Sequence, residues 1–160
     1  MGFSEVTMDV NIVVVPEAVS LAHLTSKNEV LGALAGLFSD VYDVDKGSIL
    51  DGLEQREALG STGFGRGVAI PHCRSPEIRR PTLAILKLDE PVDFAAADAM
   101  PVALFFCLIS PENAGATHLH ALAAISRMVR DESRLQRMLD APDNDALYAM
   151  LTNQFLRDAA

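Results

Sequence analysis

The sequence predicts an α/β fold: a single three-layer domain in which helices cover both faces of a mixed β-sheet. Apolar segments of strand length alternate along the chain with longer segments whose apolar residues recur at helical spacing. One strand-like segment, Val102–Ile109, is apolar throughout, which is typical of a strand buried on both faces in the middle of a sheet. Because helical segments come before, between and after the strands, we expect helices on both sides of that sheet.

The first 60 residues contain one predicted strand and two predicted helices. Val19–Leu24 has the short, mostly apolar pattern of a strand. The run Ser26-Lys27-Asn28-Glu29 forms a capping box, and the apolar residues after it predict a helix over about Lys27–Ser39. A second helix is expected over about Lys46–Ala58, with Gly60 near its end and three residues facing inward, namely Ile49, Leu50 and Leu53.

The C-terminal half combines two strands with three helices. Besides Val102–Ile109, aliphatic and β-branched residues predict a strand over Thr82–Leu88. Helical patterns return after Pro111, over about Thr117–Arg130, Glu132–Leu139 and Asp145–Asn153, the last with Asp143 or Asn144 as its N-cap.

Length and composition favour one domain over residues 1–160, with residues 1–18 as its least certain part. A chain of 160 residues with 49% hydrophobic content buries roughly 70% of its unfolded surface, which is enough for one core. No apolar run reaches about 18 residues, and the N-terminus lacks the pattern of a signal peptide. We therefore expect a cytoplasmic protein whose two cysteines, Cys73 and Cys107, are reduced.

The acidic charge narrows the class of partner. With 13 basic and 22 acidic residues, the net charge is −9. Such a charge repels nucleic acids and anionic membrane surfaces, and it favours encounter with a basic face of another protein. We expect neither nucleic-acid binding nor membrane insertion.

A glycine-rich segment that leads to a Pro-His pair is the strongest candidate for function. The run from Gly60 to Arg74 reads GSTGFGRGVAIPHCR, and its short apolar strand stops at His72. Position 68 is Val, so the segment does not complete G-x-G-x-x-G, and the chain has no phosphate-binding loop of the nucleotide type. Two interpretations remain: the glycines make only a tight turn, or they place backbone amides and an arginine near His72 to receive a phosphoryl group.

The other histidines differ in how they can contribute to such a site. His23 lies in the first strand without notable polar neighbours, and we expect it at the surface. His118 and His120 cannot face the same way on one helix. His118 begins the stripe that points inward with Leu122, Ile125 and Val129, whereas His120 begins a more solvated stripe with Ala124, Arg127 and Asp131.

These residues carry a resemblance to a known family. The run Arg56-Glu57, the stretch Ser61-Thr62-Gly63-Phe64-Gly65, the element Val68-Ala69-Ile70-Pro71-His72 and the run Thr117-His118-Leu119-His120 resemble the enzyme IIA domain of the fructose/mannitol class of the bacterial phosphotransferase system. The nitrogen-regulatory branch is the most similar. The family's fold, an α/β sandwich around a mixed sheet, agrees with the pattern of elements.

The resemblance assigns roles position by position. His72 matches the phosphoryl acceptor, His118 the second histidine of the active site, and Arg56 an arginine near it. The phosphate-binding loop residues correspond to Ser61, Thr62 and Gly63. One departure is visible, because the family usually has Gly after the acceptor histidine and this chain has Cys73.

The implied activity is that of a phosphotransferase, a component of a phosphohistidine relay. It implies transfer from the phosphocarrier protein HPr or its nitrogen-branch counterpart onto His72, without a cofactor or metal. The two motifs closest to the nitrogen-regulatory type favour regulation through target proteins over an alternative, sugar transport through a separate IIB domain. An alternative of another class, a metal-binding module using His72, Cys73 and His118, has poor chelate spacing.

Overall fold

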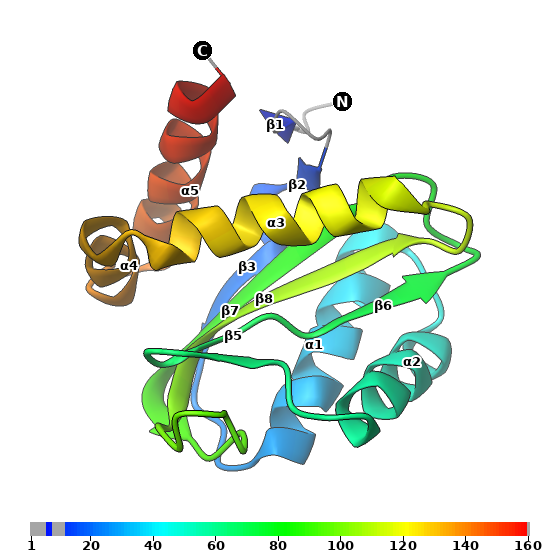
Figure 1. Ribbon diagram of the computed structural model, residues 1–160, viewed down its shortest axis with the longest axis horizontal. Helices are drawn as coiled ribbons and strands as arrows, with labels where there is room; N and C mark the ends of the chain where they lie inside the picture. Colours follow the sequence, from blue (N-terminus) through cyan, green and yellow to red (C-terminus); the bar gives the residue numbers. More distant parts are fainter. Residues whose placement is uncertain (1–5, 8–11, 160) are drawn as a thin grey trace.

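An eight-stranded mixed sheet forms the middle layer of the computed structural model, which describes residues 6–7 and 12–159, with side chains for residues 12–152 (Figure 1). The strands are β1 (Val6–Thr7), β2 (Val13–Val14), β3 (Val19–Ala22), β4 (Gly63–Gly65), β5 (Val68–Ala69), β6 (His72–Ser75), β7 (Thr82–Val92) and β8 (Val102–Pro111). The helices are the 3-10 helix η1 (Pro16–Ala18) and the α-helices α1 (Lys27–Tyr42), α2 (Lys46–Ala58), α3 (Ala116–Arg130), α4 (Glu132–Leu139) and α5 (Asn144–Ala159).

Strand β8 is the centre of the sheet, as its uninterrupted apolar run predicts. It pairs antiparallel with β7 on one side and parallel with β5 and then β6 on the other. Strand β7 in turn pairs with β2 and β3. Side chains alternate along β8, so that Leu104, Phe106 and Leu108 point to one face of the sheet and Phe105, Cys107 and Ile109 to the other.

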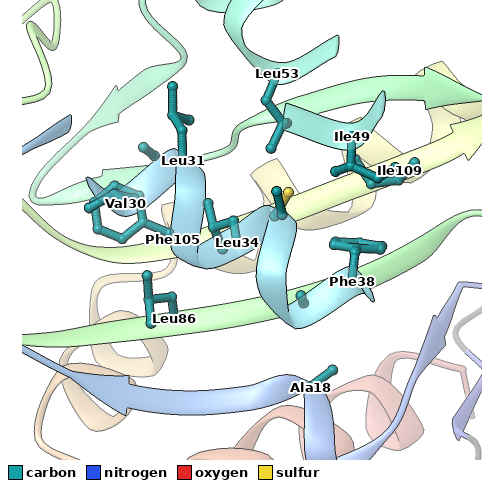
Figure 2. Close-up of a cluster of buried hydrophobic side chains, with 14 of the residues drawn as sticks. Ala18, Val30, Leu31, Leu34, Phe38, Ile49, Leu53, Leu86, Phe105 and Ile109 are labelled. Carbon is teal, nitrogen blue, oxygen red and sulfur yellow. The ribbon is translucent and has the colours of Figure 1, made fainter. Parts of the chain in front are cut away.

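Helices cover both faces, which confirms the predicted three-layer α/β fold. Helices α3, α4 and α5 pack on one face, and α1 and α2 lie on the opposite face (Figure 1). Figure 2 shows the second of these layers, where helix residues interlock with the sheet. Its fully buried members include Leu34, Phe38, Ile49, Leu53 and Phe105. Within the described part of the chain, no helix is both long enough and apolar enough to cross a membrane.

Side-chain caps fix the starts of the helices that the sequence predicts. The Ser26 hydroxyl accepts from the Glu29 amide (3.1 Å), and the Glu29 carboxylate accepts from the Thr25 amide (2.7 Å). Asp143, one of the two candidates, caps α5 by accepting from the Ala146 amide (2.8 Å). The other candidate, Asn144, instead accepts from the amide of Leu21 in β3 (3.1 Å).

Several predicted boundaries need correction. Strand β3 ends at Ala22 rather than Leu24, α1 continues to Tyr42 beyond the expected Ser39, and β7 continues to Val92. The short elements β1, β2 and η1 fall inside the N-terminal segment of residues 1–18, for which the sequence offered no prediction. Within that segment, residues 1–5 and 8–11 lie outside the described residues.

The glycine-rich segment is a hairpin rather than a plain loop. Strands β4 and β5 pair antiparallel around Arg66 and Gly67, which have φ of 59° and 84°. Strand β5 ends at Ala69, and β6 starts at His72, which pairs with Leu108. Between the two strands, the Pro71 carbonyl accepts from the Leu108 amide (2.9 Å). The prediction that His72 ends a strand is therefore wrong: Pro71 has no N–H to continue the ladder, and His72 begins the next strand (Figure 1).

Candidate active site

His72 is held at the start of β6 by a hydrogen bond through one ring nitrogen. Its Nδ1 lies 2.8 Å from the carbonyl oxygen of Ile70. Because a carbonyl oxygen only accepts, the proton of the neutral ring sits on Nδ1 and the Nε2 lone pair is left available. Burial lowers the pKa of His72 below its ordinary value, and the nearby Arg56 cation lowers it further. The hydrogen bond to Ile70 acts in the opposite direction and raises the pKa. The ring is therefore a neutral nucleophile near pH 7.

Arg56 reaches the available nitrogen from the last turn of α2. Its Nε donates to Nε2 of His72 (3.2 Å), and its Nη1 donates to the Gly60 carbonyl (2.8 Å). The resemblance matched Arg56 only to an arginine near the active site. The structure brings it into direct contact with His72.

His118 is the second histidine at this place. Its ring centroid lies 5.6 Å from that of His72, with 49° between the ring planes. It is 6% exposed, and its Nδ1 shares a hydrogen bond of 2.6 Å with the buried hydroxyl of Ser110. Burial lowers the pKa of His118 to about 4, with His72 and Arg74 as further causes. Both histidines are thus neutral at physiological pH, and Nε2 of His118 is free of the Ser110 contact.

The predicted phosphate-binding loop residues have their side chains engaged elsewhere. The Ser61 hydroxyl donates to the Phe94 carbonyl (2.6 Å). Thr62 is buried, and both its hydroxyl and its amide donate to the Glu57 carboxylate. At Gly63, an added Cβ would lie 2.6 Å from the Cβ of Ala96. The position therefore needs glycine so that the two chain segments can approach closely.

Glu57 is a buried anion beside the site to which sequence reasoning assigned no role. Its side chain is 5% exposed, and it pairs with Lys27 at the start of α1 (2.9 Å). The Lys27 ammonium also lies 4.5 Å from the centre of the Phe94 ring. Together with the Thr62 contacts, this network ties the start of α1, the end of α2 and the glycine-rich segment to one another.

Ser110 is a second residue that sequence reasoning missed. It follows the apolar run of β8 directly and is fully buried. The sequence did contain a signal for it, namely a single hydroxyl residue at the end of an apolar strand. Such a hydroxyl is expected to be buried, and a buried polar group needs a hydrogen-bond partner. That partner is His118, eight residues further along the chain.

The side chain of Cys73, the residue after His72, lies against helix α2. A Cβ added at Gly52 would lie 2.8 Å from the Cys73 sulfur, so the thiol occupies the space that the missing side chain leaves. Burial raises the pKa of the Cys73 thiol to about 12 and that of Cys107 well above its usual value. Both thiols therefore stay protonated near neutral pH.

The remaining histidines lie at the surface. His120 is exposed, although Ala124, assigned to the same solvated stripe, is buried in the core. His23 follows β3 and is exposed as expected, but the expectation that it lacks polar neighbours is wrong. Its Nδ1 lies 2.9 Å from the Asp89 carboxylate, and this contact raises the pKa of His23. Among the described residues, no three His, Cys, Asp or Glu side chains converge as a metal site would require.

The sequence is similar to those of known proteins. Residues 13–154 match the family described as "Phosphoenolpyruvate-dependent sugar phosphotransferase system, EIIA 2". A nitrogen regulatory protein of Bradyrhizobium diazoefficiens is 38% identical over 145 residues, covering 90% of this chain and 95% of the relative. A nitrogen regulatory protein of Pseudomonas aeruginosa is 43% identical over 129 residues, covering 80% and 84%.

A solved structure is also similar. The crystal structure of nitrogen regulatory protein IIA-Ntr from Neisseria meningitidis aligns with a TM-score of 0.79 at 32% identity. The alignment covers 86% of this chain and 94% of that one.

Proposed function

The chain belongs to the EIIA 2 family of the phosphoenolpyruvate-dependent sugar phosphotransferase system, and from this premise we propose that it accepts a phosphoryl group on Nε2 of His72 and acts as a regulator of the nitrogen type. One observation carries the proposal. The Ile70 carbonyl holds the proton on Nδ1, so that the lone pair of Nε2 faces Arg56 beside His118.

The transfer exchanges one phosphorus–nitrogen bond for another. The P–N bond of a phosphohistidine donor breaks, its electron pair returns to the donor nitrogen, and the Nε2 lone pair forms the new bond. The proton stays on Nδ1, which continues to donate to the Ile70 carbonyl. Before transfer, the phosphorylated ring of the donor carries a positive charge, and after transfer the phosphorylated ring of His72 carries it instead. Charge and protons are therefore conserved without an external base, a metal or a cofactor.

Arg56 and His118 stabilise the transferring group. Its charge is spread over equatorial oxygens, so catalysis consists mainly of positioning and electrostatic stabilisation. The Arg56 guanidinium lies at Nε2 and offers several N–H donors. We propose that the Ser110 hydroxyl donates to Nδ1 of His118, so that the proton of that neutral ring sits on Nε2 and can donate to a phosphoryl oxygen.

The contacts of the glycine-rich segment give its residues an indirect role. Ser61 and Thr62 hold the segment through Phe94 and Glu57, and Gly63 permits its close approach to Ala96. We propose that these residues shape the edge of the site without binding the phosphate themselves, because the amides of Thr62 and Gly63 donate to the Glu57 carboxylate and the Ser61 hydroxyl.

The partners follow from the same chemistry. We propose that the donor is the phosphocarrier protein HPr or its nitrogen-branch counterpart in the cytoplasm, and that regulatory target proteins distinguish the two phosphorylation states. Two similar proteins are named nitrogen regulatory protein, which favours regulation. The alternative, transfer to a separate IIB domain on a route to sugar, is favoured by the sugar phosphotransferase system in the family's description.

The test is incubation with the phosphocarrier, the first enzyme of the relay and phosphoenolpyruvate, followed by mass mapping of the modified residue. We expect acid-labile phosphate on His72 and loss of uptake in His72→Gln. His120→Gln is the matched control, because His120 is exposed on the same helix as His118, and it should be phosphorylated normally. Phosphate on another residue, or undiminished uptake by His72→Gln, would contradict the proposal. A second reaction with IIB domains separates transport from regulation.

A further inference from the structure

One guanidinium connects the reactive nitrogen to an exposed turn. Arg56 donates through Nε to Nε2 of His72 (3.2 Å) and through Nη1 to the carbonyl oxygen of Gly60 (2.8 Å). Gly60 belongs to the turn that ends α2, together with Leu59. Leu59 is 86% exposed, so a large apolar side chain at this turn faces solvent.

Phosphorylation of His72 removes one of these two hydrogen bonds. The Nε–H of Arg56 points at the lone pair that becomes the new P–N bond, so the contact and the bond cannot coexist. The phosphoryl oxygens attract the same guanidinium, which binds such groups through paired N–H donors. Because the guanidinium is rigid and planar, moving its Nε onto an oxygen also displaces the Nη1 that holds the Gly60 carbonyl.

The turn is free to respond, whereas the chain on either side of it is fixed. Thr62 is tied to the Glu57 carboxylate, and the Ser61 hydroxyl to the Phe94 carbonyl. Apart from the Arg56 side-chain contact with the Gly60 carbonyl, Leu59 and Gly60 are held by the closing bonds of the helix, from their amides to the carbonyls of Arg56 (3.2 Å) and Glu57 (3.1 Å). Gly60 has φ of 148° and open space around its Cβ position, so its backbone can rotate without a clash.

We propose that Arg56 couples the phosphorylation of His72 to the conformation of the Leu59–Gly60 turn, which makes this turn the surface on which the two states of the protein differ. The inference rests on the proposed function, because it requires a phosphoryl group on Nε2. A regulatory partner with an apolar contact at Leu59 then distinguishes the two states by the position of that side chain.

The experiment uses phosphoramidate, a small phosphoryl donor that needs no carrier protein. The P–N bond of phosphoramidate breaks, ammonia leaves with the bonding pair and a proton from solvent, and Nε2 of His72 forms the new bond. Amide NMR spectra of the full chain are recorded before and after labelling, with mass spectrometry to verify His72 as the modified residue. The same spectra are recorded for Arg56→Lys and Arg56→Gln.

We expect the amide signals of Leu59 and Gly60 to shift on phosphorylation and the Gly60 amide to exchange roughly 2- to 10-fold faster, the effect of losing about one hydrogen bond. The shift should shrink in both Arg56 variants, although they carry the same phosphoryl charge. The exposed turn at Ala99 and Met100, which follows a different loop, is the internal control and should not change.

The outcomes separate this inference from the proposed function. If the carrier phosphorylates His72 but the Leu59–Gly60 signals do not change, or change equally without Arg56, the coupling is refuted and the relay function stands. If the turn responds to phosphoramidate but no carrier transfers phosphate, the coupling stands and the relay function fails. If neither donor phosphorylates His72, both are wrong.

Discussion

At the scale of single residues, the site consists of two neutral imidazoles whose roles are set by the atoms that each one touches. The Ile70 carbonyl holds the proton of His72 on Nδ1, and Ser110 occupies Nδ1 of His118. Burial lowers the pKa of both rings. In the proposed function, a phosphoryl group arriving with negative charge meets His72 as the nucleophile and His118 as a hydrogen-bond donor, together with the positive charge of Arg56.

The low pKa of His118 predicts a pH-dependent loss of stability. The folded ring titrates at about 4, whereas in the unfolded chain it titrates near its ordinary value of about 6.5. The unfolded state therefore binds the proton first, so stability is full above pH 6.5 and falls as the pH drops toward 4. Between pH 7.5 and 5 this contribution amounts to about 2 kcal/mol.

The measurement is urea unfolding of the wild type and of His118→Gln at both pH values. The wild type should lose about 2 kcal/mol more than the variant between them, because the titrations of all other groups are shared. Equal losses in the two proteins would contradict the pKa assignment. Phosphoryl uptake by His118→Gln should be slower but should still occur, since the proposed acceptor, His72, remains.

At the scale of elements, the site depends on how closely helix α2 lies against strand β6. The helix supplies Arg56 and the strand begins at His72. Between them, the Cys73 sulfur fills the space over the bare backbone of Gly52. Cys73, the residue after His72, is thus a spacer between the two elements.

This contact predicts that a substitution at Cys73 reduces the destabilisation caused by a substitution at Gly52. Gly52→Ala places a Cβ 2.8 Å from the Cys73 sulfur, and such overpacking costs about 1–3 kcal/mol. The propensity gain of Ala over Gly in a helix, about 0.5–1 kcal/mol, offsets only part of it. Gly52→Ala should therefore lower the unfolding free energy and, by moving α2, slow phosphoryl uptake. In a Cys73→Gly background the same change should cost much less.

A double-mutant cycle by urea unfolding measures this coupling, with Gly32→Ala in α1 as the matched control. A Cβ at Gly32 meets nothing within 4 Å, so that change should stabilise the protein slightly through helix propensity alone. Additive effects of Gly52→Ala and Cys73→Gly would show that the two side-chain positions do not compete for space.

At the scale of the whole molecule, the sequence predicts elements that are defined by local patterns. It misses features that depend on contacts between segments far apart in the chain. The helices α2 and α4 have the predicted bounds, because caps and apolar spacing define them within a few residues. Strand β6 was not predicted, because Pro71 interrupts the pattern and only pairing with β8 restores the strand. Similarly, the family resemblance assigned Ser61 and Thr62 to phosphate binding, while their side chains contact a carbonyl and a carboxylate from other segments.

The net charge of −9 is a property of the whole molecule, and it predicts how the rate of phosphoryl uptake depends on salt. A carrier that approaches with a basic face is attracted over a Debye length, which shrinks from about 30 Å at 0.01 M salt to about 8 Å at 0.15 M. The second-order rate of phosphoryl uptake from the carrier should therefore fall on the order of tenfold over a rise to 0.5 M salt. Phosphoramidate is itself an anion, so its rate should rise or stay flat over the same range. Quenched-flow measurements with each donor on the same protein give the two slopes of uptake rate against salt concentration. Parallel slopes would mean that salt acts on the site chemistry rather than on the encounter.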